Sequence, residues 1–502
     1  MLSAYRQDTF FLSRVLPVLI GLAVIYGLLW MLAIPINAVV LAITLMVVFC
    51  LIKIPVAVSL VSAALLGGLH ARMTMPDILQ VLNDNLLSGA QVGMTYIMVG
   101  AFAVALARSG ILDWVAQKMA SSLNREGAHV RQQVKWMLFA LFIVASLLSQ
   151  NLIPVHIAFI PVLIPPLLGL MNRLRLDRRA VACILACGIS ASYLLLPFGF
   201  GAIYLNEILL ENFNSVGAAS GYAATASMAP KAMFFPVMGL LAGMLFAVFI
   251  TYRKPRDYLQ NDYLQSDGLK NNHVQVTKAE TENADMIATD EKIEIGLQPL
   301  LFTALAVVTV LLFQIYFDSL FIGAMIGFMI LGFSGIYRWQ AQDDVFTQGV
   351  RLMAEIAVII TIASSFGALL TATGDIDPLV ASATQFFGDN KLFGAAVMLV
   401  VGLFITIGFG DSFASVPILA PIYIPLAFAL GFAPLAALAM LGAAAALGDA
   451  GSPASTITLG ATAGLNADGQ HDHIKDSVIP TFFHANIGML LFTWVAVVWL
   501  LG

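Results

Sequence analysis

The most constraining feature of this 502-residue chain is an internal duplication. The segment IPVLIP at residues 160–165 recurs as APIYIP at residues 420–425. Downstream of each copy, an alanine-rich apolar run is interrupted, first by LPFGFG at 196–201 and then by DAGSP at 449–453. Duplicated apolar halves that are broken by Gly, Pro and polar residues at corresponding positions are typical of secondary transporters, whose sites lie at those breaks. The sequence therefore predicts a transporter built from two repeats.

Composition places the chain in a membrane. Hydrophobic residues make up 60% of it, charged residues make up 11%, and the mean hydropathy is +0.92, which excludes an ordinary soluble domain. Apolar runs near the ~20 residues that cross a bilayer recur from Val15 onward. We expect an all-α polytopic membrane protein with about 11 transmembrane helices. No basic stripe indicates nucleic acid, and three cysteines without CxxC indicate neither disulfides nor a metal cluster.

Positive charge in short loops predicts the orientation, because Lys and Arg are enriched on the cytoplasmic side. A cytoplasmic N-terminus puts nearly all basic loops inside, provided that residues 136–170 enter and leave on the same side. Lys135 precedes this segment and Arg173 follows it, so we expect a re-entrant hairpin. The equivalent loop at 431–434 is uncharged, as expected for an inverted repeat with two opposed hairpins and an external C-terminus. A parallel duplication is the alternative.

Four breaks in the apolar segments hold the candidate functional residues. Non-helical backbone is tolerated in a bilayer only where protein or water covers it, so broken helices are expected to line a cavity. The two hairpin tips and the two interrupted spans therefore converge on one predicted site for ions and substrate. Its candidate residues are Ser149, Asn151, Asp411 and Ser412 at the tips, and Pro197, Gly199, Asp449, Ser452, Ser455 and Thr456 at the interrupted spans.

Asp411 and Asp449 are the strongest candidates. An acid at membrane depth costs ~2.5–3.5 kcal/mol on insertion scales and is a functional candidate by default. Carboxylate, amide and hydroxyl oxygens suit sodium, which we expect at Asp411, Asn151 and Asp449. Protons compete for the same oxygens, so Asp411, Asp449 and the nearby His156 are candidates for proton coupling. The alternatives are helix caps for the aspartates and a packed position for His156.

No cofactor is expected besides sodium as a transported or coupling ion. The run His471-Asp472-His473 has metal-capable side chains, but it falls in a predicted loop without further ligands at zinc spacing. A membrane-embedded enzyme would need a nucleophile and base, or a metal and acid, at depth, and the sequence shows neither pattern. We therefore expect a transporter and not an enzyme.

Several segments resemble the bacterial Na+/H+ antiporter family of the ion transporter superfamily, which also holds proteins classed as amino-acid permeases. They are residues 95–110, 449–456 and 469–474, followed by PTFFHAN at 480–486. The resemblance implies eleven spans, two opposed hairpins, a bacterial inner membrane, and a homodimer of scaffold and transport domains. The dicarboxylate branch of that superfamily carries Ser-Asn-Thr at both tips. This chain has SQN at 149–151 and GDS at 410–412 instead.

The expected organisation combines the hydropathy pattern with this resemblance. The first half comprises N-terminal scaffold helices at 1–93 and a first transport region at 94–252, with a hairpin at 136–170 and a broken helix at 180–212. A polar cytoplasmic linker at 253–296 follows. The second half comprises scaffold helices at 297–351 and a second transport region at 352–502, with a hairpin at 392–430 and a broken helix at 435–465.

Two functions remain open at this point. The first is a Na+/H+ antiporter working by alternating access, in which Asp411 and Asp449 alternate between sodium and protons. The second is a Na+- or H+-coupled permease. Its substrate would be a histidine-like amino acid or another small carboxylate. An antiporter needs only an ion site, whereas a permease needs room for a solute, which glycines 199 and 201 would leave.

Overall fold

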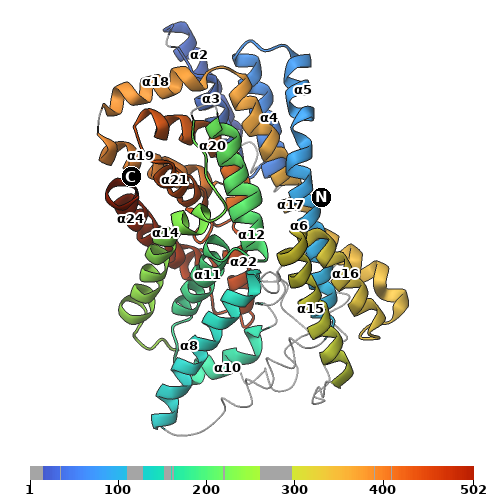
Figure 1. Cartoon of the computed structure of the whole chain (residues 1–502). Coiled ribbons are helices and arrows are strands. Elements are labelled where there is room, and N and C mark those ends of the chain that lie inside the picture. Colours follow the sequence, from blue (N-terminus) through green and yellow to red (C-terminus); the bar gives the residue numbers. More distant parts are fainter. Residues whose placement is uncertain are drawn as a thin grey trace, which may run out of the picture.

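The structure is a computed structural model, and it describes residues 15–33, 35–109, 128–151, 160, 163–218, 221–259, 297–388, 390–408 and 410–501. Every regular element in these ranges is helical (Figure 1). Within them, 7 helices are long and apolar enough to cross a membrane, and further apolar helices are shorter. The prediction of an all-α polytopic membrane protein is confirmed.

The helices of the first half run from the N-terminus to the polar linker. They are α2 (Leu16–Met31), α3 (Ala38–Leu51), α4 (Val56–His70), α5 (Met75–Asp84), α6 (Leu86–Ala107), α8 (Ala128–Asn151), α10 (Pro165–Arg173), α11 (Arg178–Leu195), α12 (Phe200–Ala202), the π-helical η2 (Ile203–Leu210), α13 (Glu211–Gly217), α14 (Met228–Phe246) and the π-helical η4 (Ala247–Thr251).

The second half begins after the linker, of which residues 260–296 lie outside the described part. Its helices are α15 (Leu297–Phe317), α16 (Leu320–Phe333), the 3-10 turn η7 (Trp339–Ala341), α17 (Gln342–Ala372), α18 (Ile376–Phe387), α19 (Lys391–Ile407), α20 (Ser412–Ala429), α21 (Pro434–Ala446), α22 (Thr456–Leu465), the π-helical η8 (His473–Val478), α23 (Ile479–Thr481), the π-helical η9 (Phe482–Asn486), α24 (Ile487–Val495) and the π-helical η10 (Ala496–Leu500).

The long helices α6 and α17 pack against each other near the centre of the molecule (Figure 1). Glycines let the two backbones approach, because a Cβ on Gly93 would lie 2.9 Å from the Ala357 carbonyl oxygen and one on Gly349 would collide with the Ala101 backbone. Small residues at the contact are common between helices in lipid, where apolar burial gives no driving force. Each helix precedes one predicted hairpin, so this contact joins the two repeats.

The first interrupted span is broken between α11 and α12. Leu196 has an extended conformation, and Pro197 lacks the N–H that a continuing helix would need. Gly199 has a φ of +61°, a conformation that glycine adopts without steric cost. Local backbone chemistry therefore ends α11 at Leu195 and delays the next helix until Phe200.

The second interrupted span is broken between α21 and α22, over residues 447–455. Leu447 leaves the helical conformation with a ψ of 135°, and Gly448 has a φ of +90°. The Ser455 hydroxyl then caps α22 by accepting a hydrogen bond from the Ile457 N–H at 3.2 Å. The interruption leaves several backbone groups that cannot make helical hydrogen bonds.

The two predicted hairpin tips differ in structure. In the second copy, α19 ends at Ile407 and α20 begins at Ser412, so Asp411 lies in the non-helical turn between them. In the first copy, Ser149 and Asn151 belong to the last turn of α8. The residues that follow, 152–159, lie outside the described part of the chain.

A buried ion pair connects the start of α11, in the first repeat, to the loop after α22, in the second repeat. The fully buried guanidinium of Arg178, at the start of α11, donates hydrogen bonds to the Asp468 carboxylate and to the Leu465 carbonyl oxygen at 2.7 Å. Burial raises the pKa of Asp468, but the hydrogen bonds and charge of Arg178 outweigh burial and hold this pKa below its usual range. Asp468 is therefore ionised at neutral pH.

We expect Arg178→Gln to lower the free energy of unfolding by about 3–5 kcal/mol, because the substitution leaves Asp468 as an uncompensated buried charge. The matched control is Arg175→Gln, since Arg175 pairs with Asp257 at the exposed surface, where ion pairs contribute little. Thermal melting of the detergent-purified protein should show a large decrease for Arg178→Gln and almost none for the control. Similar melting temperatures would contradict the structural role of the buried pair.

Candidate functional site

Asp449 lies in the second break at the centre of a buried hydrogen-bond network. Its Oδ2 accepts hydrogen bonds from the hydroxyls of Tyr193 at 2.5 Å and Ser412 at 3.0 Å, and its Oδ1 accepts one from Ser455 at 3.1 Å. Asp449 is 6% exposed, and its three partners are completely buried. The donors come from α11, from α20 and from the break itself. They offset part of the cost of removing a carboxylate from water.

Asp411 is the N-cap of α20 and is half-buried. Its Oδ1 accepts a hydrogen bond from the Ala414 N–H at 2.8 Å, and its backbone carbonyl accepts one from the Ser415 hydroxyl at 2.6 Å. The structure therefore shows the capping role that was the alternative to ion binding. A cap through one carboxylate oxygen is compatible with ion binding through the other. Ser412 follows Asp411 directly and touches Asp449, which brings the two acids to the same part of the molecule.

Asn151 joins the end of α8 to the first break. Its Nδ2 donates to the Ser192 carbonyl oxygen at 2.8 Å, and its Oδ1 accepts from the Gly201 N–H at 3.2 Å. Ser192 precedes Tyr193 in α11, so this helix connects the Asn151 contacts to the Asp449 network.

The backbone of Gly199 is hydrogen-bonded to the side-chain amide of Gln314, which was not among the residues predicted from the sequence. The Gln314 side chain of α15 accepts from the Gly199 N–H at 2.7 Å and donates to the Gly199 carbonyl oxygen at 2.9 Å. Two hydrogen bonds of this kind satisfy the backbone of a break that has no helical partner.

We expect Gly199→Ala to lower the melting temperature by about 1–3 °C, because the new Cβ would collide with the Asn151 backbone and overpacking costs of order 1–3 kcal/mol. Gly221→Ala is the matched control: Gly221 also has a positive φ, +74°, but apart from its chain neighbours no atom of the described residues lies within 4 Å of the added carbon. The control reports the backbone strain alone. Equal decreases in the melting temperature of both variants would show that the close approach of Gly199 to Asn151 does not contribute to stability.

A further serine, Ser452, lies in the second break. The Ser452 hydroxyl donates to the carbonyl oxygen of Ile407, the last residue of α19, at 2.9 Å. A Cβ on Gly410 would lie 2.8 Å from both the Ser452 hydroxyl oxygen and the Ser455 nitrogen, so the turn of the second hairpin packs directly on the break. The structure therefore brings together Asp411, Ser412, Asp449, Ser452 and Ser455.

The remaining sequence candidates lie elsewhere or outside the described part. Pro197 is exposed, and Thr456 is half-buried at the first position of α22. For Ser149 the structure describes the backbone in α8 but not the side chain, and His156 lies outside the described residues.

Sequence reasoning missed four polar residues around the breaks. Tyr193 and Gln314 bond the two breaks directly, and the Asn486 side chain accepts from the Gly448 N–H at 3.2 Å. The fourth is Tyr96 of α6, which is 5% exposed and whose hydroxyl has no hydrogen-bond partner in the described part of the chain. Each is a polar side chain inside an apolar run, and that signal could have identified them.

The oxygens of this site suit a sodium ion better than a transition metal. Among the described residues, no group of three or more His, Cys, Asp and Glu side chains is placed to hold a metal. The side chains around Asp449 offer carboxylate and hydroxyl oxygens, which are hard ligands. Mixed oxygen ligands of this kind are the ligands that hard cations prefer.

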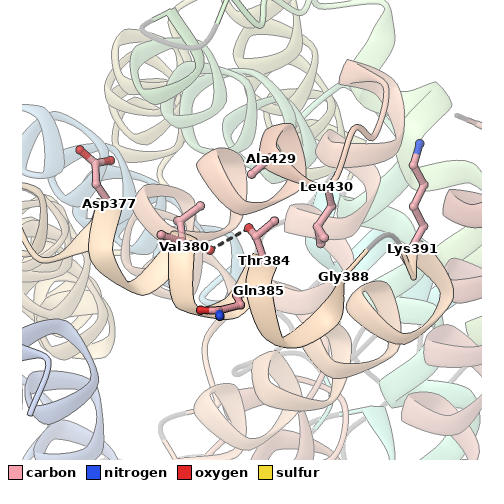
Figure 2. Close-up of a pocket in the computed structure, with 9 residues that line it drawn as sticks. Asp377, Val380, Thr384, Gln385, Gly388, Lys391, Ala429 and Leu430 are labelled. Atoms are coloured by element: carbon pink, nitrogen blue, oxygen red, sulfur yellow. Dashed lines mark hydrogen bonds between the residues drawn. The ribbon is translucent and has the colours of Figure 1, made fainter. Parts of the chain in front are cut away.

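A separate cavity of about 580 Å³ opens at the far end of α20 (Figure 2). It is lined by Asp377, Val380, Ala381, Thr384, Gln385, Gly388, Lys391, Ala429 and Leu430. At ~1.5 Å per residue, the length of α20 separates Ala429 from Asp411 by about 27 Å. The cavity is therefore distinct from the network around Asp449.

Family models match most of the chain. One described as "Na+/H+ antiporter family" matches residues 184–496, and another described as "Na+-H+ antiporter family" matches residues 37–123. The chain is 44% identical over 461 residues to an uncharacterized membrane protein of Vibrio parahaemolyticus. It is 38% identical over 461 residues to a Bacillus subtilis protein named "Putative amino acid transporter YuiF". Each alignment covers 92% of this chain and 99% of the relative.

Two solved structures share the fold. MtrF of Neisseria gonorrhoeae, described as one of a class of antimetabolite efflux pumps, has a TM-score of 0.52 at 16% identity, with 85% of each chain covered. The YdaH transporter of Alcanivorax borkumensis also has a TM-score of 0.52 at 16% identity, with 85% of this chain and 90% of that chain covered. At this identity the likeness shows the fold alone. Because a family model covers more than half of the sequence and close relatives align along nearly all of it, the chain belongs to the Na+/H+ antiporter family.

Proposed function

We propose that this protein is a Na+/H+ antiporter in which Asp411 and Asp449 alternate between sodium and protons. The family and the transporter fold support the broader conclusion of a secondary transporter. The observation that carries the finer proposal is the Asp449 carboxylate, buried in the second break and contacted by hydroxyls from three segments. A buried acid at such a junction is an expected feature of an ion pathway.

The hydroxyl partners allow the site to exchange one cation for another. Without a bound cation, Tyr193, Ser412 and Ser455 donate to Asp449. A hydroxyl oxygen also has lone pairs. Each hydroxyl can therefore turn its proton away from Asp449 and offer its oxygen to a bound sodium ion. Protonation of Asp449 removes the negative charge that holds sodium. The site therefore favours one cargo at a time, as antiport requires.

The three segments that meet at Asp449 provide a route from binding to movement. Tyr193 belongs to α11, Ser412 to the hairpin helix α20, and Ser455 to the break before α22. Exchange of sodium for a proton changes the bonds that hold these segments together. A change in their relative stability is what shifts a transporter between conformations that open to opposite sides.

A cation-coupled permease for an amino acid or another small carboxylate is the second candidate. The relative named as an amino acid transporter favours it. So does the buried hydroxyl of Tyr96, which has no hydrogen-bond partner among the described residues. The Tyr96 ring packs on Phe200 at 4.5 Å and on Phe413 at 5.3 Å between centroids, so the ring lies between the first break and the start of the hairpin helix α20. The Tyr96 hydroxyl could donate to a solute carboxylate, whose binding beside two acids would be favourable only after a cation had neutralised them.

The proposal keeps the expected arrangement in the membrane: opposed re-entrant hairpins, a cytoplasmic N-terminus, an external C-terminus, and a homodimer in the bacterial inner membrane. The charge of the loops and the family resemblance support it. Cysteines introduced at Arg175 and Ala433 should be labelled from opposite faces of the membrane. Labelling of both from one face would contradict the inverted arrangement.

Flux measurements in proteoliposomes test the function directly. In an antiporter, an imposed pH gradient should drive sodium in the direction opposite to the protons, without any organic solute. An imposed sodium gradient should likewise drive protons in the direction opposite to sodium. A permease should move sodium only when its solute is present. Sodium movement that depends on neither protons nor a solute would contradict both candidates.

A further inference from the structure

The hydroxyl of Tyr96 is buried near the middle of α6. This helix has 22 residues and is long and apolar enough to cross a membrane. The Tyr96 side chain is 5% exposed, and its hydroxyl has no hydrogen-bond partner among the described residues. A buried hydroxyl in this state lowers the stability of a protein, because its hydrogen bonds to water are lost and not replaced. Folding alone therefore does not explain a tyrosine at this position.

The other two tyrosines of the same aromatic cluster have hydrogen-bond partners. Contacts between rings connect five residues, which are Tyr96, Tyr193, Phe200, Tyr204 and Phe413. The Tyr193 hydroxyl donates to Asp449, and the Tyr204 hydroxyl donates to the Gly442 carbonyl oxygen at 2.9 Å. Both of these tyrosines are completely buried. Among the described residues, Tyr96 is thus the exception in a cluster that otherwise satisfies its hydroxyls.

The ring contacts place Tyr96 beside the two acids of the candidate site. Its ring packs on that of Phe413, the second residue of α20, at 5.3 Å between centroids. Ser412, the preceding residue, donates to Asp449, and Asp411 is the N-cap of the same helix. The start of α20 therefore contacts Tyr96 and carries or contacts both acids.

Three carboxyl groups act electrostatically on the Tyr96 hydroxyl, those of Asp411, Asp449 and Glu207 of η2. The segments that meet here contain no lysine, arginine or histidine; they are α6, α12, η2, α20 and residues 447–455. When the acids are ionised, the electrostatic potential that these segments create at the hydroxyl is negative, so it attracts a cation and repels the carboxylate of a solute. The phenol oxygen has lone pairs and can therefore bind a cation as a neutral ligand.

We propose that the Tyr96 hydroxyl is a direct oxygen ligand of the transported cation, next to Asp411 and Asp449. The inference rests on the proposed function, since it requires a cation at these two acids. It adds a ligand from α6, a helix outside both predicted hairpins and both interrupted spans. A bound sodium ion would replace the hydrogen bonds that the hydroxyl lacks, and it would hold α6 against the start of α20.

Tyr96→Phe separates a ligand from a structural hydroxyl, because phenylalanine keeps the ring contacts and removes only the oxygen. Without sodium, the purified full-length variant should melt at the wild-type temperature or up to about 3 °C above it, since an unsatisfied polar group has been removed. An ion that binds only the folded state raises the melting temperature, so a sodium titration gives the affinity. Half-saturation should require about tenfold more sodium in Tyr96→Phe than in the wild type, the order expected for the loss of one oxygen ligand.

The titration is made at a single alkaline pH, with choline chloride keeping the ionic strength constant, so that neither protons nor salt compete with sodium binding. Tyr204→Phe is the matched control, because it removes a hydroxyl of the same cluster that already has a partner in the protein. This control should melt below the wild type and should bind sodium with the wild-type affinity.

Four results would overturn the inference. Wild-type sodium affinity in Tyr96→Phe would do so while leaving the proposed function intact, and this is also the result expected if the hydroxyl bound only a solute. A melting temperature of Tyr96→Phe below that of the wild type without sodium would indicate a structural partner for the hydroxyl. An equal loss of affinity in Tyr204→Phe would indicate an effect of the packing of the cluster. If sodium did not stabilise the wild type at all, the proposed function would fail together with the inference.

Discussion

Asp411→Asn should lower sodium transport at least about 100-fold while the protein still folds, since the loss of a charged ligand costs about 3 kcal/mol. The substitution separates the two roles of this residue. Asparagine is as good an N-cap as aspartate, so the hydrogen bond to the Ala414 N–H is kept. If Asp411 only capped α20, the variant would behave like the wild type.

Asp449→Asn tests the second acid of the site by the same measurement of sodium transport. An amide keeps the shape of the side chain but presents only one acceptor oxygen, and it cannot neutralise a cation. We expect a loss of transport of the same order, together with some loss of stability, because one of the hydroxyl partners of Asp449 would face an NH2 group. Asp77→Asn is a suitable control, since Asp77 is exposed in the first turn of α5. Sodium-dependent transport at the wild-type rate in both site variants would place the ion site elsewhere.

Addition of sodium to the purified protein should release protons, up to about one for each carboxyl group that is protonated at the starting pH. Bound sodium stabilises the charged form of a carboxyl group and so lowers its pKa, whereas desolvation favours the neutral form. Release should therefore be greatest at a pH between the pKa values of the sodium-free and sodium-bound states. By reciprocity, the apparent affinity for sodium should fall as the pH decreases.

The measurement uses a pH-sensitive dye in weakly buffered detergent solution, with potassium chloride as the control for ionic strength. The Asp449→Asn protein should release fewer protons than the wild type. Absence of release at every pH between about 6 and 9 would argue against antiport and in favour of the cation-coupled permease.

Much of the backbone of the site followed from the sequence. Proline and glycine act on their own backbone, so Pro197 and Gly199 indicated a break whatever surrounded them, and the helices end and restart there. Asp411 and Ser455 lie at helix starts for an equally local reason, because their short polar side chains accept the first free N–H groups. The first hairpin tip was predicted at residues 149–151, and α8 ends there, at Asn151.

The partners of these residues were decided by the tertiary structure. The sequence identified Asp449 as a buried acid, but Tyr193 reaches it from 256 positions away, and Gln314 reaches Gly199 from 115 positions away. A hydroxyl or amide inside an apolar span is common, and its partner depends on which helix faces are packed together. The sequence by itself determined the membrane architecture, the duplication and the places where the helices break, because these depend on hydropathy and local backbone chemistry. Only the tertiary structure decided which polar groups satisfy the broken backbone, because that depends on contacts between distant segments.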